Sequence, residues 1–177
     1  MDKPTDRTVY QNAWVVDDLD AAMNKWVNEL GVGPFFVTEY GDQFASLTYR
    51  GKPAEISMRI GVSQAGPLQI ELIQPTSNDP SAYRDAYPPG TEGFHHMCVY
   101  SHDMAADTDY FERLGYPAVT AGEVGPIKFA YFDTRPLMGC MWEVVEKAPG
   151  SDERRERLQA ICANWDGINP IRRGNEM

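Results

Sequence analysis

The chain has 177 residues, enough for one compact unit or for two small repeated modules that share a core. Its 26 acidic residues outnumber its 16 lysines and arginines, and the resulting net charge of −10 disfavours nucleic acid and anionic membranes as partners. No apolar run approaches the roughly 18 residues of a membrane span, so we expect a soluble protein.

The first residues and the cysteines predict a cytoplasmic protein. The opening segment MDKPTDRTVY is polar and lacks the apolar stretch of a secretory signal. Cys98, Cys140 and Cys162 are widely spaced, odd in number and form no CxxC pair, which argues against a disulfide framework and against a thiolate zinc site. We therefore expect reduced cysteines in the core of an intracellular protein.

The segment YQNAWVVDDLDAAMNKWVNELG predicts a strand followed by a helix, because β-branched residues come first and apolar residues then take helical spacing. Asp18 is the expected N-cap and Gly31 the expected C-terminal cap. Three strands are expected next, in PFFVTEY, PAEISMRIGV and LQIELIQP, while FASLTYRG is either a further strand or an excursion. These elements define a first module at residues 8–76.

Residues 77–92 are rich in Pro, Ser, Asp and Gly and predict a surface crossover linker rather than an element. After it, HHMCVYSHDMAADTDYFERLGY repeats the order of strand and helix. Asp18 has its counterpart 85 positions later in Asp103, and Trp26 has its counterpart in Phe111. Matched cap and core positions at one offset indicate a duplication.

The second module is expected at residues 93–147, because YPAVTAG, IKFAYFDT and CMWEVVE again predict three strands. Residues 148–177 are expected to hold a C-terminal helix and tail. In SDERRERLQAICANW, Leu158, Ile161 and Trp165 share one helical face, which would pack on the body of the protein or on a partner subunit.

If the two sheets face each other as a cup, inward residues of matching strands converge on its centre. At the offset of 85 residues, His96 has Gln11 as its counterpart. The last strand of each half carries a carboxylate within an apolar run, Glu71 in LQIELIQP and Glu143 in CMWEVVE. A charge in such a run is costly unless it is paired or binds a metal.

Together these four side chains offer three oxygen ligands and one imidazole nitrogen, and the two carboxylates balance a divalent cation. The set suits zinc, nickel, cobalt, manganese or ferrous iron, and the absence of thiolates disfavours a closed structural zinc site. His95 is adjacent to His96 in an expected strand, so we expect it to point to the opposite face.

Over residues 8–147 the chain resembles the vicinal oxygen chelate superfamily, which includes glyoxalases, methylmalonyl-CoA epimerases, extradiol dioxygenases and bleomycin-resistance proteins. The motifs VVDDLDAA, IELIQP and HHMCVY with Asp103 match best and most resemble the glyoxalase and epimerase branch. The resemblance implies an α+β fold of two tandem βαβββ modules in a cupped mixed sheet. It also implies a divalent metal held by one residue from the first and one from the last strand of each module, positions that fall on Gln11, Glu71, His96 and Glu143.

Gln11 bears on the branch within this superfamily. Epimerases and extradiol dioxygenases typically place a metal histidine at this position, whereas one type of glyoxalase I has glutamine there, followed by Glu, His and Glu. The ligand set therefore resembles that of glyoxalase I.

The expected function is that of a metal-dependent lyase or isomerase that enolises a small carbonyl or thioester substrate. Glu143 or Glu71 would move the proton, with Glu143 favoured as the base. The candidate substrate contacts are Arg59, Tyr49, Tyr131 and Arg135, although a structural ion pair explains Arg59 equally well.

Two alternatives remain open at this point. One is a non-catalytic protein that binds or sequesters a hydrophobic or aromatic small molecule. The other is a ring-cleaving dioxygenase, which Gln11 disfavours because it replaces an expected iron histidine. A homodimer is expected from the paired modules and the tail helix.

Overall fold

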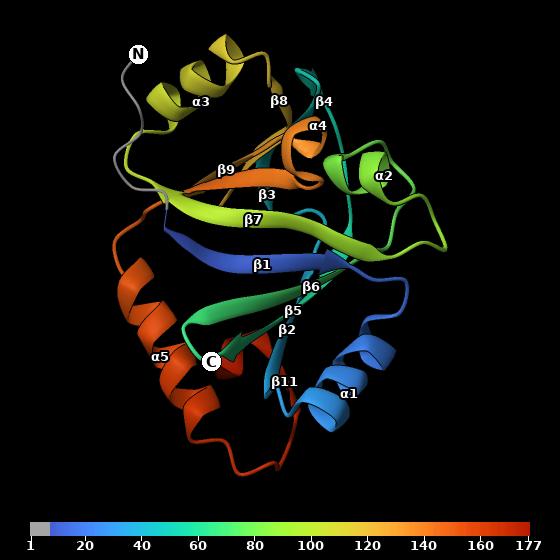
Figure 1. Ribbon diagram of the computed structural model, residues 1–177, viewed down its shortest axis with the longest axis vertical. Coiled ribbons are helices and arrows are strands. Elements are labelled where there is room, and N and C mark those ends of the chain that lie inside the picture. The colour runs from blue at the N-terminus through green and yellow to red at the C-terminus, as the bar shows by residue number, and fades with distance from the viewer. Residues whose placement is uncertain (1–7) are drawn as a thin grey trace.

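A computed structural model describes residues 8–177 of the chain. These residues form the predicted α+β fold around a mixed sheet, and the sheet has eleven strands (Figure 1). The strands are β1 (Val9–Val15), β2 (Phe35–Tyr40), β3 (Phe44–Tyr49), β4 (Lys52–Pro53), β5 (Met58–Ala65), β6 (Leu68–Pro75), β7 (Gly93–Ser101), β8 (Ala118–Val124), β9 (Ile127–Phe132), β10 (Met141–Glu146) and β11 (Ile171–Arg173). The helices are α1 (Leu19–Leu30), α2 (Ala82–Ala86), α3 (Met104–Arg113), α4 (Arg135–Met138) and α5 (Ser151–Ala163), followed by a 3₁₀ turn at Gly174–Glu176.

The two matched helices begin as the sequence predicts. The side chain of Asp18 accepts a hydrogen bond from the backbone N–H of Ala21 at 2.9 Å, and Asp103 accepts one from Ala106 at 3.0 Å. Each bond satisfies a backbone donor that the first helical turn would otherwise leave free. At the other end of α1, Gly31 takes the left-handed conformation, with φ of 67°, as expected for a C-terminal cap.

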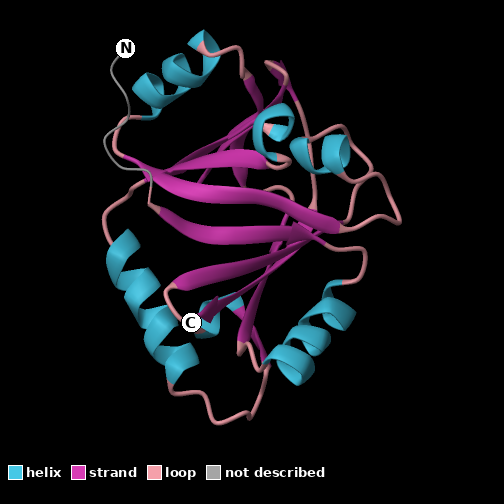
Figure 2. Cartoon of the chain, in the orientation of Figure 1, coloured by secondary structure: helices cyan, strands magenta, loops and turns pink. Residues whose placement is uncertain are grey.

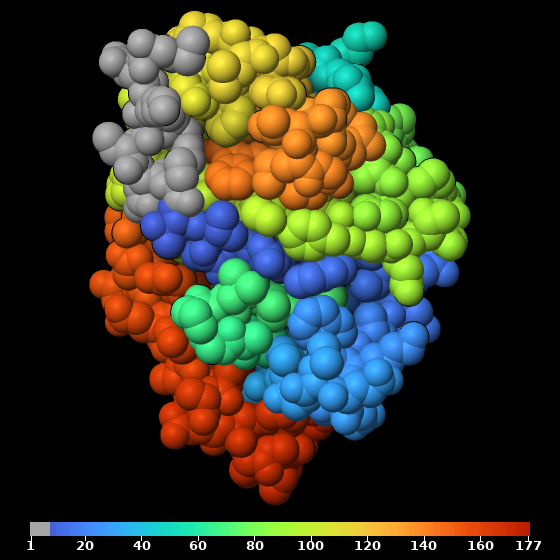
Figure 3. All heavy atoms as spheres, in the orientation of Figure 1, coloured from blue at the N-terminus to red at the C-terminus, as the bar shows by residue number. Residues whose placement is uncertain are grey.

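β1 and β7 run antiparallel side by side through the middle of the molecule and join the two modules (Figures 1 and 3). Gln11 lies opposite Cys98, and His96 lies opposite Ala13. His96 follows Gln11 by 85 positions, and Cys98 follows Ala13 by 85 positions. Exchanging the two modules therefore turns one of these pairs into the other. The duplication predicted from the sequence is therefore a pseudo-twofold relationship in the sheet.

The outer neighbours of the central strands follow the same relationship. β6 runs parallel to β1 and places Glu71 beside Ala13, while β10 runs parallel to β7 and places Glu143 beside Cys98. Since Ala13 and Cys98 are equivalent, Glu71 and Glu143 take equivalent places in the two modules.

The sheet curls into a cup because a short loop connects two strands that lie near its opposite ends. The order is β11-β2-β5-β6-β1-β7-β10-β9-β8-β3-β4, so β2 and β3 lie near opposite ends. Only residues 41–43 connect them along the chain. FASLTYRG is therefore an excursion from the first module, since β3 pairs antiparallel with β8 of the second.

Two β-bulges interrupt the central strand pair. In β7, His95 is the extra residue between the pairs Ala13–His96 and Trp14–Phe94; in β1, Tyr10 is the extra residue before Gln11. A bulge turns consecutive side chains away from strict alternation. The expectation that His95 points away from His96 is therefore wrong: the imidazole rings lie 5.1 Å apart, and both residues are buried.

The crossover is more ordered than the sequence predicts. It contains α2, in which Ala82 is fully buried and Tyr83 is 3% exposed. Tyr83 packs against His95, with ring centroids 5.0 Å apart. The aromatic contact explains the difference, because burying the tyrosine fixes a segment that its polar composition assigns to the surface.

α1 and α3, one from each module, cover the outer side of the sheet, whereas α5 lies over the cup (Figures 1 and 2). Leu158 of α5 is buried, and the helix packs against β5. The chain then returns and forms β11, a strand that the sequence does not predict. β11 pairs parallel with β2. No helix within residues 8–177 has the length and apolar character needed to cross a membrane.

Candidate active site

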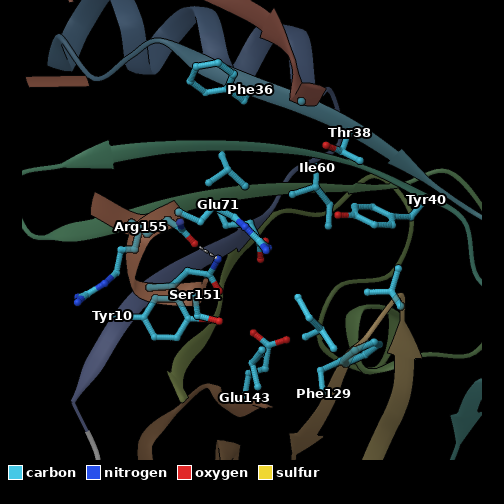
Figure 4. Close-up of a pocket in the computed structure, with 18 of the residues that line it drawn as sticks. Tyr10, Phe36, Thr38, Tyr40, Ile60, Glu71, Phe129, Glu143, Ser151 and Arg155 are labelled. Atoms are coloured by element: carbon cyan, nitrogen blue, oxygen red, sulfur yellow. Dashed lines mark hydrogen bonds between the residues drawn. The ribbon is translucent and has the colours of Figure 1, made fainter. Parts of the chain in front are cut away.

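The cup encloses a cavity of about 270 Å³ that both modules line (Figure 4). Most of its wall is aromatic or aliphatic, and the lining includes Phe36, Tyr40, Phe44, Ile60, Phe129 and Tyr131. Gln11, Glu71 and Glu143 line the same cavity. A few polar groups thus line a cavity whose wall is mainly apolar, an arrangement typical of small-molecule sites.

The structure brings the predicted histidine and carboxylates together. Nε2 of His96 lies 3.0 Å from Oε2 of Glu143 and 3.6 Å from Oε2 of Glu71. His96 is fully buried, and the two glutamate side chains are 8% and 12% exposed, respectively. β7 positions the histidine between β6 and β10 of the two modules, which explains why residues so far apart in the sequence meet here.

Gln11, the fourth predicted ligand, reaches the same group of side chains with its amide nitrogen. Nε2 of Gln11 donates to Oε1 of Gln69 at 2.6 Å, and the amide also hydrogen-bonds Glu71. For Gln11 to bind a metal through its oxygen, its side-chain amide must rotate by about 180° so that Oε1 and Nε2 exchange places. The two ends of a glutamine amide are nearly equal in size, so this rotation needs no change in packing volume.

The donor set fits a divalent cation, although no group of three or more His, Cys, Asp and Glu side chains within residues 8–177 has the arrangement of a formed metal site. Nε2 of His96 is buried and has no hydrogen-bond partner, yet it faces two carboxylates. Ligand atoms around a zinc-type ion with bonds of about 2.1 Å lie roughly 3.0–3.4 Å apart. The observed separations of 3.0 and 3.6 Å are close to that range, so a cation or a proton can balance this cluster.

The two carboxylates differ electrostatically. Burial raises the pKa of Glu71 to about 7, helped by the negative charge of Glu143 and opposed by His96 and the Gln11 hydrogen bond. Burial also pushes the pKa of Glu143 upward, but the electrostatic interaction with His96 and hydrogen bonds from Cys98 and Tyr131 outweigh it and hold that pKa below its usual value. Equivalent positions in the duplication therefore carry carboxyl groups with different proton affinities.

Two buried tyrosines complete this end of the cavity. The hydroxyls of Tyr83 and Tyr131 lie 2.9 Å apart, and burial raises the pKa of each well above its usual value, so both stay protonated. Tyr131 also hydrogen-bonds Glu143, so it links Tyr83 to this carboxylate. Sequence reasoning included Tyr131 but missed Tyr83, because it assigned the crossover to the surface.

Three of the candidate substrate contacts are placed elsewhere. Arg59 pairs with Asp20 at 2.9 Å, Tyr49 donates to Asp85 at 2.9 Å, and Arg135 pairs with Asp133 at 2.6 Å. None of the three lines the cavity, since each is held by a carboxylate outside it.

The C-terminal segment supplies cavity residues that sequence reasoning missed. Ser151, Arg154 and Leu158 of α5 line the cavity, as does Met177 at the end of the chain. The apolar face predicted around Leu158 was the one signal in the sequence that this helix would pack on the body of the protein.

A cupped pair of βαβββ modules, with polar residues of matching strands at its centre, defines a glyoxalase-type fold. The sequence pattern of the Glyoxalase/Bleomycin resistance protein/Dioxygenase superfamily matches residues 10–131. The chain therefore belongs to this superfamily, the vicinal oxygen chelate superfamily that its motifs resemble. No curated protein matches the chain by sequence.

Solved structures agree on the fold. Methylmalonyl-CoA epimerase from Mycobacterium tuberculosis is 20% identical, with 82% of this chain and 91% of the epimerase covered and a TM-score of 0.55. A methylmalonyl-CoA epimerase in complex with methylmalonyl-CoA is 18% identical, covering 80% and 94% with a TM-score of 0.53. A hypothetical protein from Bacillus halodurans is 15% identical, covering 80% and 94% with a TM-score of 0.51. At these identities the likeness concerns the fold.

Proposed function

We propose that the protein is a divalent-metal-dependent enzyme that removes a proton next to the carbonyl group of a small carbonyl or thioester substrate. The observation that carries this proposal is the buried Nε2 atom of His96, which faces Glu71 and Glu143 at one end of an apolar cavity. Gln11, Glu71, His96 and Glu143 would hold the metal.

A bound divalent ion would supply electrophilic stabilisation of the negative charge that develops on a carbonyl oxygen as the neighbouring proton leaves. The apolar wall around Phe129 and Ile60 would hold the body of the substrate and exclude water. Glu143 points into the cavity beside Phe129, which suits it to accept the proton (Figure 4). Glu71 is a second carboxylate in the same cavity that can carry a proton.

The substrate class remains a small carbonyl compound or a thioester. Support for a thioester comes from the epimerase of the same fold that binds methylmalonyl-CoA. A cavity of about 270 Å³ holds an acyl group, and the rest of such a ligand would extend out of the cup.

Metal binding is the first test. Protein stripped of metal should bind one divalent ion per chain in calorimetric titrations with zinc, nickel, cobalt and manganese. His96→Ala and Glu143→Ala should lose this binding, whereas His102→Ala, on an exposed loop residue, should keep it. Absence of binding by the unaltered protein would exclude metal-dependent catalysis.

Proton abstraction is the second test. In deuterated water, NMR should detect metal-dependent exchange of the proton next to the carbonyl in at least one member of a panel of 2-oxoaldehyde hemithioacetals and acyl thioesters. Glu143→Gln should slow this exchange by about 100-fold or more, the range for loss of a general base. Exchange that survives in both Glu143→Gln and Glu71→Gln would contradict the proposal.

The aromatic wall also favours a second candidate, a binding protein that sequesters an apolar small molecule. Tyr40, Phe44 and Phe129 form a row of rings along the cavity lining, with successive centroids 6.0 and 6.1 Å apart. Such a protein would retain an aromatic ligand through purification and would catalyse no deuterium exchange, so the same experiment separates the two functions.

A further inference from the structure

Three buried groups form a chain of contacts that leads from a backbone carbonyl to the candidate metal site. Nε2 of His95 lies 3.1 Å from the carbonyl oxygen of Ala82, and Nδ1 of His95 lies 2.9 Å from Nδ1 of His96. Nε2 of His96 faces Glu71 and Glu143 at the far end. The bulge at His95 makes this chain feasible, because regular alternation would place the two rings on opposite faces of the strand.

The two ring nitrogens of His95 are both accounted for by its contacts with Ala82 and His96. Its ring lies between Tyr83 and Tyr131, at centroid distances of 5.0 and 5.7 Å, and the residue is 1% exposed. A charged imidazole buried this deeply, with a backbone carbonyl and a second imidazole as its hydrogen-bonding partners, would be costly, so the ring is neutral and carries one N–H. The position of that single hydrogen decides the rest of the chain.

A backbone carbonyl oxygen only accepts hydrogen bonds, so the hydrogen of His95 lies on Nε2 and points at Ala82. Nδ1 of His95 then has a lone pair and accepts from Nδ1–H of His96. This leaves Nε2 of His96 as the nitrogen that presents a lone pair to a cation between the carboxylates. The opposite placement would set two lone pairs against each other at Ala82, without water to separate them.

We propose that His95 is a positioning residue: it relays the fixed direction of the Ala82 carbonyl to His96 and so selects Nε2 of His96 as the ligand nitrogen. This inference rests on the proposed metal-dependent function, but the proton positions can be tested without metal or substrate. It also assigns a role to α2, since a change in the position of Ala82 would remove the relay.

The first experiment measures the proton positions directly. Two-bond and three-bond ¹H–¹⁵N correlation spectra of the ¹⁵N-labelled, metal-free protein should show only three imidazole spin systems, from His95, His96 and His102. His95 should carry its proton on Nε2 alone, and Nδ1 of His96 should be protonated whether or not Nε2 is. A protonated Nδ1 in His95, or an unprotonated Nδ1 in His96, would overturn the proposal even if the protein binds metal.

The second experiment uses a matched pair of variants. His95→Asn keeps an acceptor near the position of Nδ1, whereas His95→Phe keeps the ring but leaves Nδ1–H of His96 without a partner. We expect zinc affinity to fall about 10- to 100-fold in His95→Phe, the range for loss of a group that orients a ligand histidine, and to recover largely in His95→Asn.

The outcomes of this second experiment separate orientation from packing. Equal weakening of zinc affinity by both variants would indicate that His95 acts through packing alone and would overturn the proposal, as would unchanged affinity in both. If the unaltered protein binds no metal, the proposed function fails, while the NMR spectra still decide the arrangement of protons.

Discussion

Asn12 pairs with Met97 at the point where the two modules meet. Because residue 97 is the counterpart of residue 12 at the offset of 85, this pair maps onto itself, and the pseudo-twofold axis of the sheet passes through it. The histidine, the glutamine and the two carboxylates of the cluster are therefore arranged around one axis. Differences between paired positions are then a guide to function, since the duplication alone would make them alike.

The equivalent helix caps provide a test of the duplication in terms of stability. Asp18→Ala and Asp103→Ala should each lower the free energy of unfolding by about 1 kcal/mol, because each leaves one backbone N–H of its helix without an acceptor. Urea denaturation would measure both. Asp109→Ala, within α3, should have a smaller effect, and a cost at only one of the two caps would show that the modules differ in local stability.

The raised pKa of Glu71 predicts a pH-dependent contribution to stability in the metal-free protein. Its pKa is about 7 in the folded state against an ordinary value of 4.5, so the folded state binds more protons between these limits. The contribution is therefore fully present below about pH 4.5 and is lost as the pH rises through about 7. Bound metal should remove this loss, because a cation compensates the ionised carboxylate.

Comparison with Glu71→Gln isolates this contribution from those of other groups. The difference in unfolding free energy between the unaltered protein and the variant should shift in favour of the variant as the pH rises from 4.5 to 8, when no metal is present. Each unit of pKa difference corresponds to about 1.4 kcal/mol. Glu29→Gln, at an exposed position of α1, serves as the control, and a constant difference across the range would show that Glu71 has an ordinary pKa.

The pairing of β3 with β8 depends on the absence of a side chain at Gly122. A Cβ atom there would lie 2.8 Å from the carbonyl oxygen of Ser46 and 2.9 Å from side-chain carbons of Leu47 and Phe129. Gly122→Ala should therefore lower the free energy of unfolding by about 1–3 kcal/mol, as overpacking does in other cores. Gly41→Ala, whose Cβ would meet only a carbon atom 3.9 Å away, should be nearly neutral in the same denaturation experiment.

The last four residues are expected to control access to the cavity. Gly174 and Met177 line it, although the segment Gly174–Glu176 contains no buried residue. A chain that ends at Arg173 should keep its unfolding temperature within a few degrees but lose bound zinc to a chelator several-fold faster. Asn175→Ala, which leaves the cover in place, should release zinc at the rate of the unaltered protein. Equal rates in all three proteins would show that metal leaves by another route.

The sequence was sufficient to predict the fold and the cluster of carboxylates around His96. Both depend on periodic features, because caps and inward-facing residues recur at a fixed offset and a strand fixes the face of every second residue. The position of His95 was not predictable in this way. A bulge inserts one residue against the partner strand, so it depends on register between segments far apart in sequence.

The substrate contacts show a second limit of sequence reasoning. Arg59 and Arg135 stand in strand-like or polar contexts that do not reveal which carboxylate is near, and the structure pairs them with Asp20 and Asp133. Tyr83 was missed for the opposite reason, since its neighbours are polar while its own ring is buried. Such assignments depend on tertiary contacts that leave no periodic signal.

The pairing of β3 with β8 also has a consequence for the order of folding during synthesis. When a ribosome has released the first module, β3 is paired only with the two-residue β4, and its other edge is open until β8 emerges. One edge of β1 is likewise open until β7 emerges. Unpaired strand edges promote association with other chains. The first half alone is thus a vulnerable intermediate, and the second half acts as its intramolecular chaperone by occupying both edges at once.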